Sequence, residues 1–137
     1  AELTERLNSL TCTTAPTLCA LKGVGPDVAA KLLITAGDNP HRIHSDPAFV
    51  ALCGVAPVDA SSGKQQRHRL NRGGNRQANN ALWTITIVRM SSDQRTREYV
   101  TRRTQQGLTK PEIIRCLKRY IARETRQAIL KDLPQLV

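Results

Sequence analysis

The sequence predicts a small all-α domain in which a helix-hairpin-helix motif is followed by a basic, glycine-containing loop. Three observations predict this class. Most of the 137 residues fall in segments whose apolar side chains recur at helical spacing. Capping residues, Gly or Pro bound most of these segments. Only residues 55–74 show neither helical nor strand periodicity, so we expect a loop there, with a short extended pair as the alternative. A chain of this length is expected to form one domain, residues 1–137.

The first helix is predicted over residues 2–10, where leucines recur at helical spacing: Leu3, Leu7 and Leu10. A short helical segment begins at Pro16 and stops at Gly23. The next helix follows the turn, with Gly37 as its C-terminal stop. Its apolar face consists of Val28, Ala29, Leu32 and Leu33. Together these two segments and the glycine turn make the predicted helix-hairpin-helix, residues 16–37.

A further short helix is predicted in the stretch SDPAFVALCG. Asp46 is expected to be its N-cap, Pro47 its first helical residue and Gly54 its terminator. After the loop, a longer helix is predicted from Asn75 to Met90, and its apolar stripe comprises Ala78, Ala81, Leu82, Ile85 and Val88. Trp83 lies within this helix and is expected in the core.

The C-terminal part of the helical remainder, residues 75–133, predicts two more helices. Asp93 is placed to cap a helix that runs to about Gln106 and ends at Gly107. Thr109 and Glu112 have the spacing of a capping box at the start of the last helix. Its apolar face continues through Ile114, Leu117, Tyr120 and Ile121 towards Leu130.

Charge points to a polyanionic partner. The formal net charge is +10 and the sequence pI is about 10.2, and so large an excess repels itself unless an anion neutralises it. Nucleic acid is the first candidate, and no membrane association is expected, because no apolar stretch approaches the length of a transmembrane helix. The four cysteines form no CxxC pair and are expected to be buried or idle thiols.

The turn Lys22-Gly23-Val24-Gly25 is predicted to bind a phosphate of DNA or RNA. Two glycines let the backbone turn tightly, and the exposed N–H groups together with the next helix N-terminus attract anionic oxygens. Lys22 adds a positive charge. Such a hairpin holds the nucleic-acid backbone without reading sequence. The alternative is a helical hairpin whose glycines only turn the chain.

The basic serine loop, residues 55–76, is the second predicted binding element. Its candidate phosphate-binding residues are Lys64, Arg67, His68, Arg69, Arg72 and Arg76. No acid is interspersed among them, unlike the mixed charges of an ordinary solvated surface. If about five phosphate contacts form, the slope of log affinity against log salt is expected near −4 to −5.

Ser61 and Ser62 lie in this loop. A serine among cations can act as a nucleophile on phosphorus, although Ser-Ser-Gly is more often only a turn. A metal-dependent nuclease needs clustered carboxylates, whereas Asp27, Asp38, Asp46 and Asp59 are isolated along the sequence. We therefore expect no metal site in this chain.

Two stretches, LKGVGPDVAAKLLITAGD and FVALCGVAPVDASSGKQQRHRLNRGGNRQANNALW, resemble the C-terminal domain of DEDD-type insertion-sequence transposases. This group is related to the Piv DNA invertase and is known as the bridge-RNA-guided recombinases. The ordered matches are residues 23–26, 37–38, 54–57, 62–63 and 71–76. The resemblance covers residues 16–90 well and the rest loosely.

The resemblance implies a DNA recombinase with two parts. A RuvC-like N-terminal domain carries the carboxylates and binds Mg²⁺, and the C-terminal domain supplies a serine that links covalently to DNA. Ser62 matches that serine, with Ser61 as the fallback. The resemblance also implies a guide RNA, a homo-oligomer, for which the last helices are the expected interface, and a bacterial cytoplasmic, nucleoid-associated location. We interpret the chain as an isolated C-terminal half that binds nucleic acid without cutting. The alternative is a non-catalytic helix-hairpin-helix module.

Overall fold

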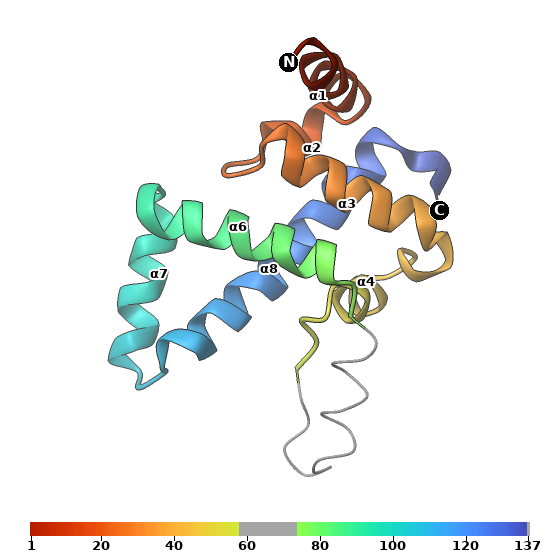
Figure 1. Cartoon of the computed structure of the whole chain (residues 1–137). Coiled ribbons are helices and arrows are strands. Elements are labelled where there is room, and N and C mark those ends of the chain that lie inside the picture. Colours follow the sequence, from red (N-terminus) through yellow and green to blue (C-terminus); the bar gives the residue numbers. More distant parts are fainter. Residues whose placement is uncertain (58–73, 137) are drawn as a thin grey trace.

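The computed structural model describes residues 1–57 and 74–136, and in them it contains seven α-helices, two short 3₁₀ turns and no strand. The predicted all-α class is confirmed (Figure 1). The helices are α1 (Glu2–Thr14), α2 (Pro16–Ala20), α3 (Pro26–Asp38), α4 (Asp46–Leu52), α6 (Arg76–Ser92), α7 (Gln94–Gln105) and α8 (Lys110–Asp132). The 3₁₀ turns are Pro40–Arg42 and Pro134–Leu136.

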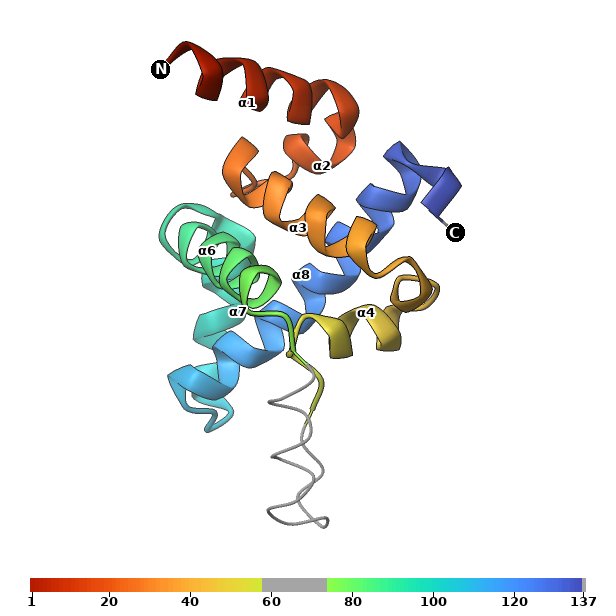
Figure 2. The ribbon, with the colours of Figure 1, turned by 45° about the vertical axis from the view of Figure 1, so that its right-hand side comes forward.

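The long helix α8 is the centre of the fold, because α2, α4, α6 and α7 all pack against it. In Figure 1, α8 passes behind α6, and in Figure 2 it runs diagonally beneath α3, with α6 on its left and α4 on its right. Its buried face alternates with charged positions at helical spacing. The largest fully buried apolar side chains come from several helices and the loop before α4: Phe49, Leu18, Leu32, Ile43, Leu82, Ile85, Ile113 and Ile129. Aliphatic residues thus make almost all of the core.

Two predicted N-terminal caps are confirmed. The Asp93 carboxylate accepts from the Thr96 amide at 3.1 Å at the start of α7. At the start of α8, Thr109 and Glu112 form the reciprocal capping box. Both caps satisfy amides that the first helical turn leaves without intrahelical partners.

Two predicted helix ends are wrong. Ser45, not Asp46, is the N-cap of α4, and its hydroxyl accepts from the Ala48 amide at 3.2 Å. Asp46 instead pairs with Arg126 of α8 at 2.8 Å, because tertiary packing brings a buried arginine to it. Helix α3 also runs through Gly37 to Asp38.

Several residues predicted for the apolar faces are exposed. Trp83 is 46% exposed, so its predicted place in the core is wrong, and Val88 and Tyr120 are also exposed. The leucine stripe of α1 (Leu3, Leu7 and Leu10) is exposed as well, and α1 contributes no buried residue. Helical spacing correctly located these helices, but it did not identify which faces another element covers.

Candidate nucleic-acid interface

The predicted site residues divide between described and undescribed parts of the chain. The structure describes Lys22, Gly23, Val24, Gly25 and Arg76. The others lie outside the described residues: Ser61, Ser62, Lys64, Arg67, His68, Arg69 and Arg72. The alternative of a short extended pair concerns the same undescribed stretch. The structure does describe the residues on either side of this stretch, 54–57 and 74–76, which we call the loop base.

The two ends of the serine loop are held together. The Asn75 amide donates to the Leu52 carbonyl at 2.7 Å. Beside this bond the backbone of Gly74 passes so close to Gly54 that a Cβ on Gly74 would lie 2.7 Å from the Gly54 Cα. Gly54 itself has a φ of +72°, which favours glycine. The backbone geometry at the loop base therefore requires glycine at both positions: Gly74 for its close approach to Gly54, and Gly54 for its positive φ.

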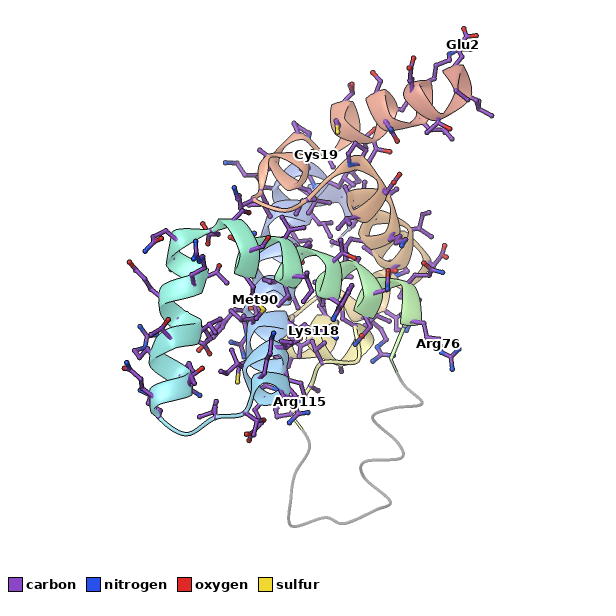
Figure 3. The ribbon with its side chains drawn as sticks, turned by 60° about the vertical axis from the view of Figure 1, so that its left-hand side comes forward. Glu2, Cys19, Arg76, Met90, Arg115 and Lys118 are labelled. Carbon is purple, nitrogen blue, oxygen red and sulfur yellow. The ribbon has the colours of Figure 1, made fainter. Side chains whose placement is uncertain are left out.

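A pocket of about 360 Å³ opens at this base. We call it the loop-base pocket, and its described lining residues are Gly54, Gly74, Asn75, Arg76, Asn79, Asn80, Trp83 and Lys118. Asn79 joins its walls: its amide nitrogen donates to the Cys53 carbonyl at 3.0 Å, and its amide oxygen accepts from Lys118 Nζ at 3.0 Å. Figure 3 shows Arg76 directed outward at the start of α6 and Lys118 on α8.

The described lining of the loop-base pocket contains two cations and no carboxylate. Burial lowers the pKa of the Lys118 ammonium, because partial desolvation disfavours its charged form. An anion bound beside Lys118 would offset that penalty. The pocket is therefore suited to a phosphate and unsuited to a cationic ligand.

The glycine turn between α2 and α3 makes close internal contacts. Gly23 has a φ of +84°, and a Cβ there would lie 3.3 Å from the Ile85 carbonyl oxygen of α6. The Val24 side chain is buried, and its amide donates to the Leu21 carbonyl at 3.1 Å. Gly25, by contrast, has open space around its Cα. Tight packing against α6 thus accounts for Gly23, and phosphate binding by this turn stays a prediction.

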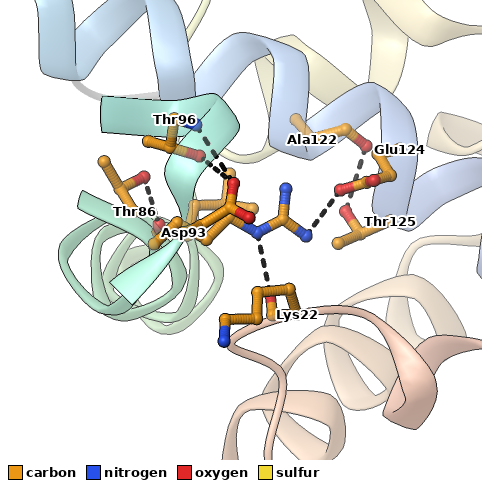
Figure 4. Close-up of polar contacts among 9 residues, drawn as sticks. Lys22, Thr86, Asp93, Thr96, Ala122, Glu124 and Thr125 are labelled. Carbon is orange, nitrogen blue, oxygen red and sulfur yellow. Dashed lines mark hydrogen bonds and ion pairs between the residues drawn. The ribbon is translucent and has the colours of Figure 1, made fainter. Parts of the chain in front are cut away.

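Arg89 of α6 fastens the turn to the rest of the domain through contacts with Lys22 on the turn and Glu124 on α8, both of which Figure 4 labels. Its Nε donates to the Lys22 carbonyl at 2.7 Å, and its Nη2 lies 2.7 Å from a Glu124 carboxylate oxygen of α8. Nearby, a hydrogen bond from the Thr96 side chain is the main reason that the pKa of Asp93 is lowered. The Lys22 backbone is thereby fixed while its side chain remains exposed.

Lys22 opens into a cleft of about 690 Å³ between the turn, α7 and α8. We call it the arginine cleft, and its lining residues are Lys22, Arg89, Asp93, Arg95, Thr96, Glu98, Tyr99, Arg102, Leu117, Tyr120, Ile121 and Glu124. The structure thus brings Lys22 together with arginines of α7. The Lys22 carbonyl is bonded to Arg89, which lies roughly 20 Å along α6 from Arg76 at 1.5 Å per residue, so Lys22 and Arg76 lie near opposite ends of this helix.

Within residues 1–57 and 74–136, positive charge is most concentrated in a segment that the sequence analysis did not select. Residues 94–123, which form α7 and the first half of α8, carry nine Lys or Arg and two Asp or Glu. We call this segment the basic arm. Six of its cations are exposed: Arg95, Arg97, Arg102, Lys110, Arg115 and Arg123. A windowed charge count would have found it, although its cations are spread out at helical spacing and form no run.

Within residues 1–57 and 74–136, no group of three or more His, Cys, Asp or Glu could hold a metal ion. None of the helices in these ranges is both long enough and apolar enough to cross a membrane. The four thiols are free. Burial raises the pKa of Cys53 to about 12, so this thiol is protonated and unreactive at neutral pH.

Comparison with known proteins identifies relatives. The sequence profile described as "Transposase IS116/IS110/IS902 family" matches residues 15–101. A curated relative from Streptomyces coelicolor, "Insertion element IS110 uncharacterized 43.6 kDa protein", is 33% identical over 109 residues. The alignment covers 77% of this chain and 26% of the relative, so the chain spans about a quarter of that relative's length. No solved structure matches the chain.

Proposed function

This chain belongs to the IS116/IS110/IS902 family of insertion-sequence transposases, and from that premise we propose that it is the C-terminal, nucleic-acid-binding domain of a transposase, in which Ser62 attacks the DNA backbone during strand exchange. A transposase acts on DNA, so DNA is the partner of the family. The C-terminal position, the serine and the strand-exchange step are the parts that we propose.

Two cationic surfaces support binding to the DNA backbone. One is the loop-base pocket with Arg76 and Lys118, and the other is the basic arm with its six exposed cations. Exposed guanidinium groups suit phosphate oxygens, because they present several donors in a fixed plane. Lys22 adds one contact from the glycine turn. We propose that the turn is a minor contributor and that the basic arm and the serine loop supply most phosphate contacts.

One observation supports the catalytic part of the proposal. The two ends of the serine loop are fixed to each other, and they lie beside the cations Arg76 and Lys118. The Asn75–Leu52 hydrogen bond and the Gly54–Gly74 contact fix both ends of the segment that carries Ser61 and Ser62. In the proposed step the Ser62 Oγ forms a bond to phosphorus and one phosphorus–oxygen bond to a sugar breaks. The hydroxyl proton passes to the departing sugar oxygen. Arg76 and Lys118 would stabilise the negative charge of the transition state.

The Mg²⁺ that the family resemblance implies does not fit the described residues, which provide no cluster of metal-binding side chains. We propose that its carboxylates lie in the N-terminal domain that the resemblance implies. A guide RNA, a homo-oligomer and a bacterial nucleoid location are likewise proposals that rest on the resemblance.

The test is covalent trapping of DNA by a full-length transposase that carries this domain. Wild-type protein and a Ser61→Ala variant are expected to form an adduct that resists denaturation, whereas Ser62→Ala forms none and keeps nearly the same DNA affinity. An adduct with Ser62→Ala but not with Ser61→Ala would move the nucleophile to Ser61. An adduct with the double variant Ser61→Ala, Ser62→Ala would refute serine attack from this loop and favour a non-catalytic binding module.

A further inference from the structure

Trp83 is exposed, and membership of the transposase family does not explain why. It is the only tryptophan of the chain, and 46% of its surface is exposed. An indole is a large apolar group, so leaving it uncovered forgoes much burial free energy. Ala81 and Leu82, which precede it on α6, are fully buried, but they point to other faces of the helix, so the indole lies on the open face of α6.

The indole lines the loop-base pocket instead of lying on a flat surface. The same pocket is lined by the cations Arg76 and Lys118 and by the side-chain amide of Asn80, whose oxygen accepts from Lys31 and whose nitrogen is the donor offered to a base edge. An aromatic ring, cations and amides are the three kinds of group that bind an unpaired nucleotide, through its base, its phosphate and its base edge. The volume of about 360 Å³ is at the small end of ligand pockets, which suits one nucleotide.

Hydrogen bonds hold the pocket walls in place without a ligand. Lys118 on α8 bonds to Asn79 on α6 at 3.0 Å, and Lys31 on α3 bonds to the Asn80 side chain at 3.2 Å. Three helices therefore fix the polar groups around Trp83. Such preorganisation reduces the entropy lost when a ligand binds.

We propose that the loop-base pocket binds one unpaired nucleotide of a DNA strand, with its base stacked on Trp83 and its phosphate on Arg76 and Lys118. This inference rests on the proposed function, which brings DNA to the loop base. Stacking of a base on Trp83 would keep one DNA strand unpaired next to the loop base. The pocket then selects unpaired DNA, whereas the basic arm binds any phosphate backbone.

Because Trp83 is the sole tryptophan, its fluorescence reports on this pocket alone. We expect a single-stranded DNA oligonucleotide to quench it strongly. The same strand with abasic residues is expected to bind through its phosphates, as measured by anisotropy of a labelled strand, with little quenching. The same measurement is made with RNA of the same sequence. Quenching by RNA without quenching by DNA would overturn the assignment to DNA.

Substitution provides the second readout. Trp83→Leu is expected to weaken binding of the intact single strand roughly tenfold, in the lower range of base–aromatic stacking, and to leave binding of the abasic strand unchanged. Trp83→Tyr should restore most of the loss. Val88→Ala, an exposed position on the same helix outside the pocket, is the matched control and should change neither affinity.

The outcomes separate this inference from the proposed function. Equal quenching by intact and abasic strands, or equal affinity of Trp83→Leu and wild type for the intact strand, would overturn the nucleotide pocket while DNA binding stands. A chain that binds neither single-stranded nor duplex DNA at low salt would overturn both.

Discussion

The glycine turn and the basic arm differ in net charge and in the exposure of their residues to solvent. Residues 15–38, which contain the turn, carry two Lys or Arg and two Asp or Glu, whereas residues 94–123 carry nine and two. Gly23 packs against the backbone of α6, and Val24 is buried. The arginines of α7 are mostly exposed.

This difference shows that a glycine turn whose sequence is typical of phosphate-binding hairpins can serve the internal packing of a domain. The shape of the turn is explained by its contact with α6, so shape by itself does not establish a ligand. Affinity for a polyanion follows the number of exposed cations. The four predictions below test the comparison, from the largest expected effect to the smallest.

Replacing three exposed arginines of the basic arm is expected to have the largest effect. The triple change Arg95→Gln, Arg97→Gln and Arg102→Gln should lower DNA affinity roughly 100-fold at 0.1 M salt and reduce the salt slope by about 2.7. Lys22→Gln should reduce the slope by no more than about 0.9. Fluorescence anisotropy across a salt series measures both. A larger loss from Lys22→Gln than from the triple variant would reverse the comparison.

Arg126 is the exception among the C-terminal cations because it is structural. It is buried, donates from Nε to the Ile43 carbonyl at 2.8 Å and pairs with Asp46. Arg126→Ala should lower the free energy of unfolding by about 3 kcal/mol, because it leaves these acceptors unpaired. Arg123→Ala, an exposed control, should cost less than about 1 kcal/mol. Denaturant unfolding measures both, and equal costs would contradict a structural role for Arg126.

The two glycines of the turn should respond differently to alanine. Gly23→Ala forces a positive φ on alanine and places its Cβ against the Ile85 carbonyl, so we expect a loss of about 1–3 kcal/mol of stability. Gly25→Ala has open space and should change stability by less than about 0.5 kcal/mol. Thermal unfolding provides the comparison. If Gly25→Ala instead weakens DNA binding while the fold stays intact, the turn is a phosphate site.

The substitution of Asp132 is expected to have the smallest effect of the four, a small loss in the free energy of unfolding. Its carboxylate accepts from the Thr17 and Leu18 amides at 3.1 and 3.0 Å at the start of α2. Burial raises the pKa of Asp132, but the hydrogen bonds from Thr17 and Leu18 outweigh it and hold the pKa below 3.8. The stabilisation is therefore present above about pH 4 and is lost as the pH falls through the lowered folded-state pKa.

Asp132→Asn should thus cost roughly 1 kcal/mol at neutral pH, and its difference from wild type should shrink in acid. Denaturant unfolding at neutral pH and near pH 3 measures the change. Asp38→Asn, at the exposed end of α3, is the control. A difference that grows in acid would contradict the capping role.

The predicted architecture was largely correct, and the errors have identifiable causes. Helical periodicity located every long helix, and the local signals at Asp93 and at Thr109–Glu112 predicted their caps. Asp46 was assigned wrongly because Arg126, which is 80 residues away along the chain, engages its carboxylate. The pocket was missed because Trp83 was expected in the core, and no local pattern distinguishes a covered face of α6 from an open one.

By itself, the sequence determined the all-α class, the locations of the long helices, the net positive charge and the transposase family, because these depend on spacing, composition and ordered motifs along the chain. Only the tertiary structure decided that Gly23 serves packing, that Lys22 lines the same cleft as arginines of α7 and that Trp83 lines the loop-base pocket. The physical reason is that exposure and proximity are set by contacts between distant segments, which periodicity along one segment does not encode.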